Sequence, residues 1–245
     1  MRVLTLNIWK DAGDLAARLE TIVAECRLLQ PDIICLQEVY ADAEIDAGEW
    51  LAHALGLTRV GVPAREKQRS GVLSSSGLAL LSRLPLLAEE NLDLPTSSAD
   101  GGRKALYGVF ETASGPLRVV SLHLSHIKGE EGDFLRSQQS AAVWSWVSQG
   151  WDHPIILAGD FNATRKAACF DLLAQPEDLF GTDSLLPQAS SLRDQPNALI
   201  DHILLAGRGR WKLSGAELCF TETDDATGCF ASDHFGILAD FEPIG

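Results

Sequence analysis

The sequence predicts a layered α/β protein, and three stretches within its first 40 residues carry this prediction. Residues 3–8 (Val-Leu-Thr-Leu-Asn-Ile) directly follow Met1 and Arg2 and form an apolar run typical of a buried strand. Residues 14–29 carry apolar side chains at helical spacing, and residues 33–36 (Ile-Ile-Cys-Leu) are a short apolar run typical of a strand covered on both faces. A strand, a helix and a strand in this order favour stacked layers of helix and sheet.

The later elements follow from the same patterns. The first helix can be capped by Asp11 or Asp14, and Pro31 ends it. Two further helices are expected, at 133–147 and at 164–174. Six more strands are expected where short apolar runs lie between turn-forming residues, at 77–81, 106–111, 117–124, 154–158, 199–205 and 235–241.

Polar, glycine-rich or proline-rich stretches between these elements are expected to be loops. None resembles an interdomain linker, because a strand candidate resumes promptly after each, so residues 1–245 are interpreted as a single domain. One of the loops contains a basic segment, Arg65, Lys67 and Arg69, whose simplest interpretation is a solvated surface. The expected loops are 63–76, 95–103, 181–198 and 221–233.

Composition narrows the class of protein. The chain has 34 acidic against 20 basic residues, a formal net charge of −14, which weighs against tight binding of duplex nucleic acid. Its five cysteines are an odd number without a Cys-x-x-Cys pair, which argues against a disulfide framework and a structural zinc site. No apolar run is long enough to span a membrane and no secretory signal pattern is visible, so a cytoplasmic location is expected unless a signal was removed. We expect a monomer.

The most informative feature is that apolar strand candidates repeatedly end in groups suited to binding metal or phosphate. Any one of these groups has a plain structural explanation as a turn former, a helix cap or a buried histidine. Their recurrence favours a site, because such groups are costly to bury unless paired, and ligand sites of α/β sheets gather outside strand ends. The residues concerned are Asn7, Glu38, His123, Asp160, Asn162, Asp201, Asp233 and His234.

Seven short motifs, in order along the chain, resemble those of the endonuclease/exonuclease/phosphatase superfamily. A single Gly-Asp-Phe-Asn would be a weak signal, whereas seven motifs in the family's order over residues 5 to 234 are a strong one. The motifs are Thr5-Leu6-Asn7-Ile8-Trp9, Leu36-Gln37-Glu38-Val39, Gly77-Leu78-Ala79-Leu80-Leu81-Ser82-Arg83, Ser121-Leu122-His123-Leu124, Gly159-Asp160-Phe161-Asn162, Ile200-Asp201-His202-Ile203 and Ser232-Asp233-His234.

The resemblance implies a four-layer sandwich, in which two mixed β-sheets pack face to face with helices outside. It also implies a Mg²⁺ or Mn²⁺ site at one end of the sheets, with Glu38 as the main ligand and Asn7 and Asp233 beside it. This set agrees with the preference of magnesium for a few oxygen ligands and several retained waters. No cluster of histidine and cysteine indicates a zinc site instead.

The resemblance further implies that water attacks the phosphoester in line. Asp160, positioned by Asn162, is expected to orient and deprotonate this water. His234, held by Asp201, is expected to donate a hydrogen bond to a non-bridging phosphate oxygen. Whether Asp160 or His234 is the base is left open at this point.

Substrate contacts are also implied by the resemblance. His123 is the candidate that protonates or stabilises the leaving group. Phosphate contacts are expected from Arg103, which resembles a phosphate-binding arginine of the family, and from Asn162 and His234.

The expected activity is hydrolysis of phosphoester bonds, with a phosphodiesterase as the leading interpretation. Trp9 and His123 differ from the residues at corresponding places in apurinic-site endonucleases, and the histidine is similar to pancreatic-type deoxyribonucleases and neutral sphingomyelinases. Small phosphodiesters or phosphomonoesters fit the acidic chain best, while a nuclease and a phosphodiesterase of lipid headgroups are alternatives. No apolar stretch supplies the membrane anchor that sphingomyelinase-like members often carry.

Two rival classes make different predictions. A calcineurin-like metallophosphoesterase needs a Gly-Asn-His-Asp or Gly-Asn-His-Glu segment, which this chain lacks. A binding protein that keeps the fold but has lost catalysis predicts at least one broken motif position, and all the positions are intact.

Overall fold

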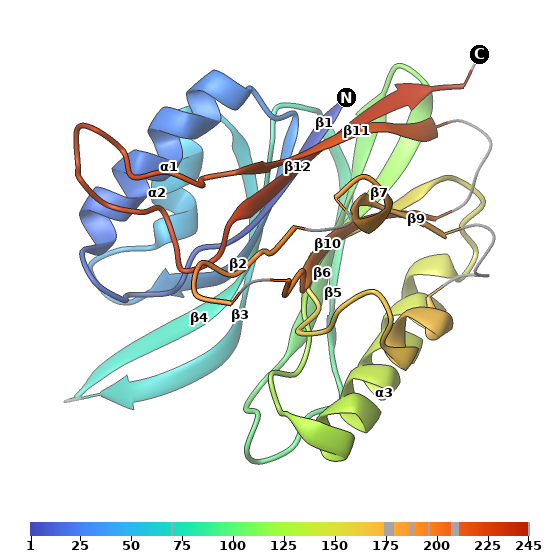
Figure 1. The fold of residues 1–245 in the computed structure, drawn as a ribbon, viewed down its shortest axis with the longest axis horizontal. Coiled ribbons are helices and arrows are strands. Elements are labelled where there is room, and N and C mark those ends of the chain that lie inside the picture. Colours follow the sequence, from blue (N-terminus) through green and yellow to red (C-terminus); the bar gives the residue numbers. More distant parts are fainter. Residues whose placement is uncertain (70, 174–178, 187–188, 196, 207–210, 245) are drawn as a thin grey trace.

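The computed structural model describes residues 1–69, 71–173, 179–186, 189–195, 197–206 and 211–244. Within these residues, two six-stranded sheets pack face to face between helices, which confirms the expected four-layer sandwich (Figure 1). The strands of the first sheet are, from edge to edge, β11 (Trp211–Cys219), β12 (Gly236–Pro243), β1 (Arg2–Asn7), β2 (Ile33–Ala41), β4 (Val72–Ser82) and β3 (Thr58–Arg69). The strands of the second sheet are β5 (Leu86–Asp93), β6 (Lys104–Thr112), β7 (Gly115–His123), β8 (Ile155–Asp160), β10 (Asp201–Ala206) and β9 (Leu179–Gly181).

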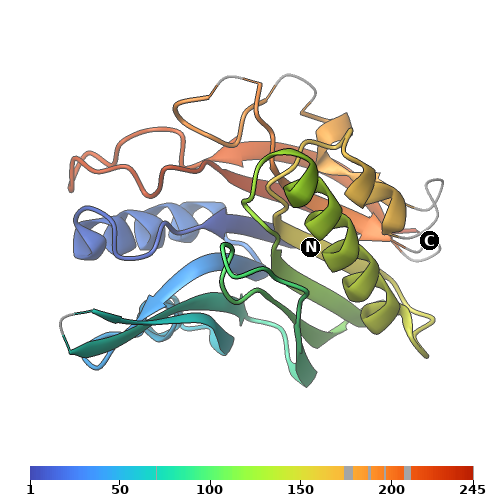
Figure 2. The ribbon, with the colours of Figure 1, turned by 90° about the horizontal axis from the view of Figure 1, so that it is seen from below.

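Both sheets are mixed, and each contains one parallel pair at its centre. Strand β1 runs parallel to β2, and β7 runs parallel to β8, whereas the other paired strands are antiparallel. Parallel neighbours need a long crossover, which α1 (Leu15–Leu29) and α3 (Gly129–Ser148) supply. Together with α2 (Ala47–Leu55), α1 covers the outer face of the first sheet, while α3 covers that of the second (Figures 1 and 2).

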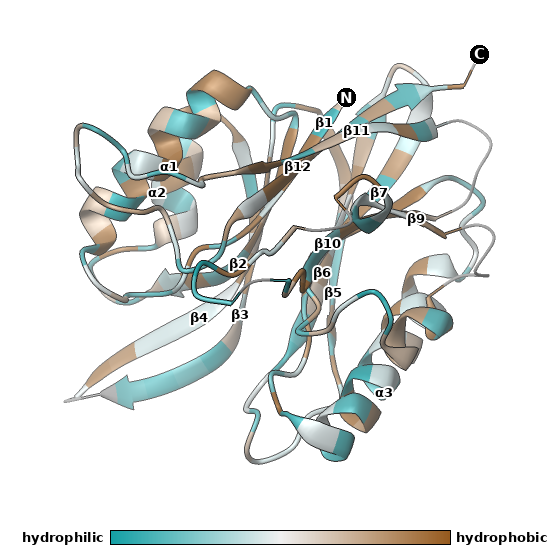
Figure 3. Ribbon diagram, viewed as in Figure 1, coloured by the Kyte–Doolittle hydropathy of each residue, from teal (hydrophilic) through white to brown (hydrophobic). Residues whose placement is uncertain are grey.

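The alternation of side chains along a strand divides the apolar residues among three cores. In β1, Val3 packs between the two sheets, whereas Leu4 and Leu6 pack against the helices of the first sheet. A third core lies between the second sheet and α3. Figure 3 shows the resulting hydrophobic colour along the central strands, with hydrophilic patches on the outer faces of the helices.

Local signals set the ends of α1. The Asp14 carboxylate accepts a hydrogen bond from the Ala17 N–H at 3.0 Å, so Asp14 rather than Asp11 is the capping residue. At the other end, Gln30 adopts a left-handed conformation with φ of 52°, and Pro31 prevents continuation.

The loop predicted at 63–76 is wrong, because most of it is the β3–β4 hairpin. Cross-strand pairing continues from Thr58↔Ser82 to Arg69↔Val72, with an irregularity between Pro63 and Arg65. The outer part of the hairpin projects beyond the rest of the first sheet (Figure 1). Main-chain hydrogen bonds hold the two strands together in this segment. Many of its side chains are polar, so the sequence shows no apolar alternation that would predict strands.

One helix prediction is wrong, and one helix was missed. The segment 164–174 contains only a short 3₁₀ helix, η1 (Ala168–Leu172), and residue 174 lies outside the described residues. Its N-terminal residue Ala167 makes no side-chain cap. Conversely, α2 was not predicted, although Asp46 caps it by accepting the Glu49 N–H at 3.0 Å.

All five cysteines are free thiols, in agreement with the sequence-based argument against a disulfide framework. Among the described residues, no helix has both the length and the apolar character needed to cross a membrane.

Candidate active site

The predicted site residues come together because of strand direction. The parallel strands β1, β2, β7 and β8 end at one edge of the sandwich, where register places His123 beside Asp160. Strand β10 is antiparallel to β8 and therefore starts at this edge, with Asp201 paired to Asp160. Strand β12 is antiparallel to β1, so the Ser-Asp-His motif just before it reaches the same edge.

Asp160 lies at the centre of the site and joins the two sheets. Its Oδ2 accepts a hydrogen bond from the side-chain amide of Asn7 at 3.2 Å, across from the first sheet. His123 Nε2 lies 3.4 Å from the same oxygen, and His234 Nε2 lies 4.0 Å from it. Asp160 is 2% exposed, so protein groups rather than water surround its carboxylate.

The turn after Asp160 explains the glycine and asparagine of its motif. Gly159 has φ of +148°, and a Cβ at this position would lie 2.0 Å from the Leu122 carbonyl oxygen of β7. Asn162 has φ of 50°, its backbone N–H donates to Asp160 Oδ1 at 2.8 Å, and its side chain donates to the Leu124 carbonyl at 3.1 Å. The turn therefore fixes the rotation of the Asp160 carboxylate.

His234 is held by Asp201, as predicted. The two side chains form a buried hydrogen bond of 2.8 Å between His234 Nδ1 and Asp201 Oδ2. Ser232 positions the motif, since its hydroxyl donates to the Asn7 carbonyl at 2.6 Å and accepts the His234 N–H at 3.1 Å. The loop that carries His234 is thus tied to the end of β1.

Burial and neighbouring charges shift the pKa values of Asp160, His234 and His123 in different directions. Burial and the charge of Asp201 raise the pKa of Asp160 to about 7. For His234, burial lowers the pKa, but the charge and hydrogen bond of Asp201, aided by Asp160 and Asp233, outweigh it and raise the pKa to about 10. Burial, together with the charges of Arg103 and His234, lowers the pKa of His123 well below its usual range. At neutral pH, His234 is therefore an imidazolium and His123 a neutral imidazole.

The predicted metal ligands lie at the same edge. Glu38 sits in a β-bulge between Gln37 and Val39 with φ of 55°, which directs its side chain into the site. Its Oε1 is 3.0 Å from the Lys10 ammonium. Asp233 has its pKa raised, first by burial and also by the charge of Glu38, so the two carboxylates repel each other across the site. A divalent cation would relieve this repulsion, and the oxygen donors suit magnesium.

A second group could hold a metal by distance alone. The ligand atoms of Asp160, Asp201 and His234 all lie within 4.8 Å of one another. A protonated His234, whose Nδ1 is hydrogen bonded to Asp201, has no lone pair to offer a metal. We therefore interpret these three residues as a hydrogen-bonded acid–base group rather than a metal centre.

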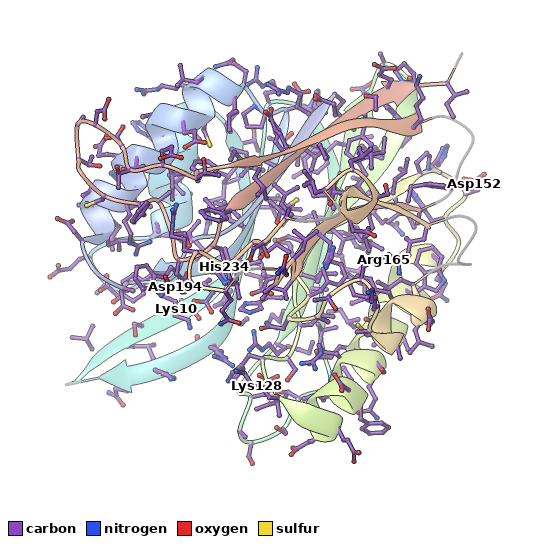
Figure 4. The ribbon with its side chains drawn as sticks, viewed as in Figure 1. Lys10, Lys128, Asp152, Arg165, Asp194 and His234 are labelled. Atoms are coloured by element: carbon purple, nitrogen blue, oxygen red, sulfur yellow. The ribbon has the colours of Figure 1, made fainter. Side chains whose placement is uncertain are left out.

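Arg103 lies beside the site, but its guanidinium group is already engaged. It is buried, and its Nη2 donates to Asp100 Oδ1 at 2.9 Å and contacts His126 Nδ1 at 2.8 Å. Arg103 lines the same hollow as Glu38 and His123. Figure 4 places Lys10, which lines this hollow, near His234 on the side where the hairpin leaves the body of the protein.

Two arginines that sequence reasoning missed hold the loops of the site. Arg18 of α1 donates to the carbonyl oxygens of Ile8 at 2.5 Å and Ala231 at 3.3 Å, which joins the segment after Asn7 to the segment before Asp233. Arg193 donates to the Ser232 carbonyl at 2.7 Å. Both act through main-chain carbonyls, which leave no pattern in the sequence.

Comparison with known proteins identifies the family. The family model described as "Endonuclease/Exonuclease/phosphatase family" matches residues 4–234. No curated protein matches the chain.

Solved structures share the fold over the whole chain. The human Nocturnin catalytic domain with bound sulfate anion is 25% identical, with 100% of this chain and 93% of that chain covered and a TM-score of 0.78. Danio rerio TDP2 complexed with single strand DNA product is 19% identical, with 99% and 98% covered and a TM-score of 0.76. An endonuclease/exonuclease/phosphatase from Beutenbergia cavernae is 21% identical, with 100% and 72% covered and a TM-score of 0.77.

Proposed function

Since this chain belongs to the endonuclease/exonuclease/phosphatase family, whose members hydrolyse phosphoesters, we propose that it is a divalent-metal-dependent phosphodiesterase. One observation carries the proposal. Asp160 lies where the two sheets meet, within 4.0 Å of both His123 and His234, and each of the three has a proton affinity far from its ordinary value.

The pKa shifts favour one of the two assignments of the base that the sequence left open. His234 is already protonated at neutral pH and cannot accept a proton, so Asp160 is the base that takes one from the attacking water. The His234 imidazolium, held by Asp201, donates a hydrogen bond to a non-bridging phosphate oxygen and stabilises the charge that develops there. Asn162 holds the Asp160 carboxylate in place through its backbone N–H, and its side chain is the expected phosphate contact.

The leaving group and the metal complete the proposal. His123 is neutral, so we assign it to donating a hydrogen bond to the leaving oxygen rather than to full proton transfer. Glu38, Asn7 and Asp233 would hold Mg²⁺ or Mn²⁺, which supplies Lewis-acid stabilisation of phosphate charge. Arg103 adds positive charge beside the phosphate while Asp100 fixes its position.

The test uses bis(p-nitrophenyl) phosphate and supercoiled plasmid DNA as substrates, with Mg²⁺ or Mn²⁺ and an EDTA control. Turnover should require metal and fall at least ~10²-fold in Asp160→Ala, the scale of a lost general base. Asp152→Ala is the matched control, because this exposed carboxylate lies far from His234 in Figure 4. Full activity of Asp160→Ala, or activity that survives EDTA, would contradict the proposed roles.

A lipid phosphodiesterase is the second candidate, and one observation favours it. Val72 and Leu73, on the outer part of the β3–β4 hairpin, are 49% and 59% exposed. Two aliphatic side chains are a small patch, so this candidate ranks behind the first. Hydrolysis of sphingomyelin vesicles that is lost in Val72→Ser/Leu73→Ser, while plasmid and small diesters are still cleaved, would favour it.

A further inference from the structure

A basic groove runs from the candidate active site along the β3–β4 hairpin. We define the hairpin groove as the hollow lined by Lys10, Tyr40, Arg65, Lys67, Ser74 and Ser76, together with Asp11 and Ser75. It shares Lys10, Arg65 and Ser76 with the hollow that contains Glu38 and His123, so the two hollows adjoin.

Strand register concentrates polar donors on this side of the hairpin. Arg65 pairs with Ser76 and Lys67 with Ser74, and residues two apart on a strand point to the same face. The groove face of the hairpin therefore carries two cationic residues whose Cα atoms lie about 7 Å apart, each opposite a serine. Glu66 lies between them in sequence and points to the other face, so the hairpin presents no carboxylate of its own to the groove.

The charge of the groove is opposite to that of the whole chain. The protein has a formal charge of −14, yet three cationic side chains line this hollow against the single carboxylate of Asp11. Lys10 is in addition paired to Glu38 at 3.0 Å, and a divalent cation at Glu38 would compete with this ammonium. Local positive charge in an acidic protein points to an anionic ligand.

Asp100 holds Arg65 in place but also pairs with Arg103, so it does not neutralise both arginines. Its Nη2 donates to the Asp100 carbonyl and lies 3.4 Å from Asp100 Oδ1. The same carboxylate oxygen also accepts from Arg103 at 2.9 Å and contacts His126 at 2.7 Å. One buried carboxylate thus faces two guanidinium groups and can neutralise the charge of only one of them.

We propose that the hairpin groove binds a second phosphate group of the substrate, next to the phosphoester that is cleaved. This inference rests on the proposed function and narrows its substrate class to phosphodiesters with an additional phosphate nearby. Arg65 binds that phosphate from a fixed position, and Lys67 and the serine hydroxyls complete its contacts. The additional phosphate can belong to a nucleotide strand or to a phosphorylated sugar headgroup, and the experiment separates these sources.

The first measurement is binding without turnover. Calorimetry should give at least ~10-fold tighter binding of thymidine 3′,5′-bisphosphate than of thymidine 5′-monophosphate to the wild-type protein. The preference should shrink as NaCl is raised, and it should disappear in Arg65→Met/Lys67→Met. Lys67→Met alone, at an exposed position, should reduce it and serves if the double variant folds poorly. Lys212→Met is the matched control, since this lysine is exposed and lines a hollow that shares no residue with the groove.

The second measurement is hydrolysis, in two arms. One compares the dinucleotide TpT with pTpT and TpTp, and the other compares glycerophosphoinositol with its 4-phosphate. The arm in which the added phosphate raises kcat/KM at least ~10-fold identifies the source. No preference for a second phosphate in binding or in either arm, or a preference that Arg65→Met/Lys67→Met retains, would overturn the inference. A binding preference without hydrolysis of any diester would instead refute the proposed function and leave the groove as an anion site.

Discussion

Replacing Gly159 by alanine tests whether the contact between β7 and β8 sets the position of Asp160, the proposed catalytic carboxylate. The added Cβ would lie 2.0 Å from the Leu122 carbonyl oxygen, whereas ordinary contacts of this kind are 3.4–4 Å. The ends of the two strands must therefore separate by about 1 Å or more, and the residue must also keep φ of +148°, a conformation rare for alanine. Asp160 follows directly on β8 and His123 ends β7, so their 3.4 Å separation changes with the strands.

A displacement of about 1 Å at a catalytic group costs roughly 10²-fold in rate. Strain at such a backbone position costs about 1–3 kcal/mol of unfolding free energy. We therefore expect Gly159→Ala to lower kcat on bis(p-nitrophenyl) phosphate by roughly 10²-fold and to lower the urea midpoint of unfolding. Gly215→Ala is the matched control, because a Cβ there would meet only the Asp240 side chain, at 3.4 Å or more. If Gly159→Ala kept the activity and the urea midpoint of the wild type, the reasoning would be refuted.

Two further predictions concern charge. Burial lowers the pKa of His202, whose Nε2 contacts the Ala163 carbonyl at 3.0 Å and whose Nδ1 has no hydrogen-bond partner in the described part of the chain. Below pH about 6.5 the unfolded chain protonates this histidine, whereas the folded protein keeps it neutral, so the free energy of unfolding falls as pH falls. Urea unfolding at pH 7.5 and at pH 5 should therefore show a smaller loss of stability in His202→Phe than in the wild type. Lys10→Met removes the cation paired with Glu38 and should raise the apparent Mg²⁺ affinity by up to ~5-fold. The affinity is measured from thermal shifts against MgCl₂ concentration. Unchanged or weaker binding would exclude competition between Lys10 and the metal for Glu38.

The sequence placed most of the proposed catalytic residues correctly at strand ends, because the ends of buried apolar strands can be recognised in a sequence. An apolar run such as Ile155–Ala158 must be buried, and the aspartate two residues later must then lie at the edge of a sheet. The direction of each strand could not be predicted in the same way. It is this direction that brings Asp201, at the start of an antiparallel strand, to the same edge as Asp160.

Other features were hidden for physical reasons. The β3–β4 hairpin is held largely by main-chain pairing, so its serines and charges gave the composition of a loop. Arg18 was indistinguishable from a surface arginine, because its partners are carbonyl groups that belong to any residue type. Arg103 was expected to contact phosphate, and its anchoring by Asp100, three residues earlier in the same loop, depends on a loop conformation that no apolar periodicity encodes.

The path of the chain through the two sheets has a consequence for synthesis on the ribosome. The second sheet uses the continuous segment 86–206, whereas the first combines the strands before residue 83 with two strands after residue 210. A nascent chain can contain Glu38 and Asp160 long before Asp233 and His234 emerge. It then lacks both the imidazolium and the serine that ties the final motif to β1. The proposed site therefore stays incomplete until the last strand of the first sheet has been made.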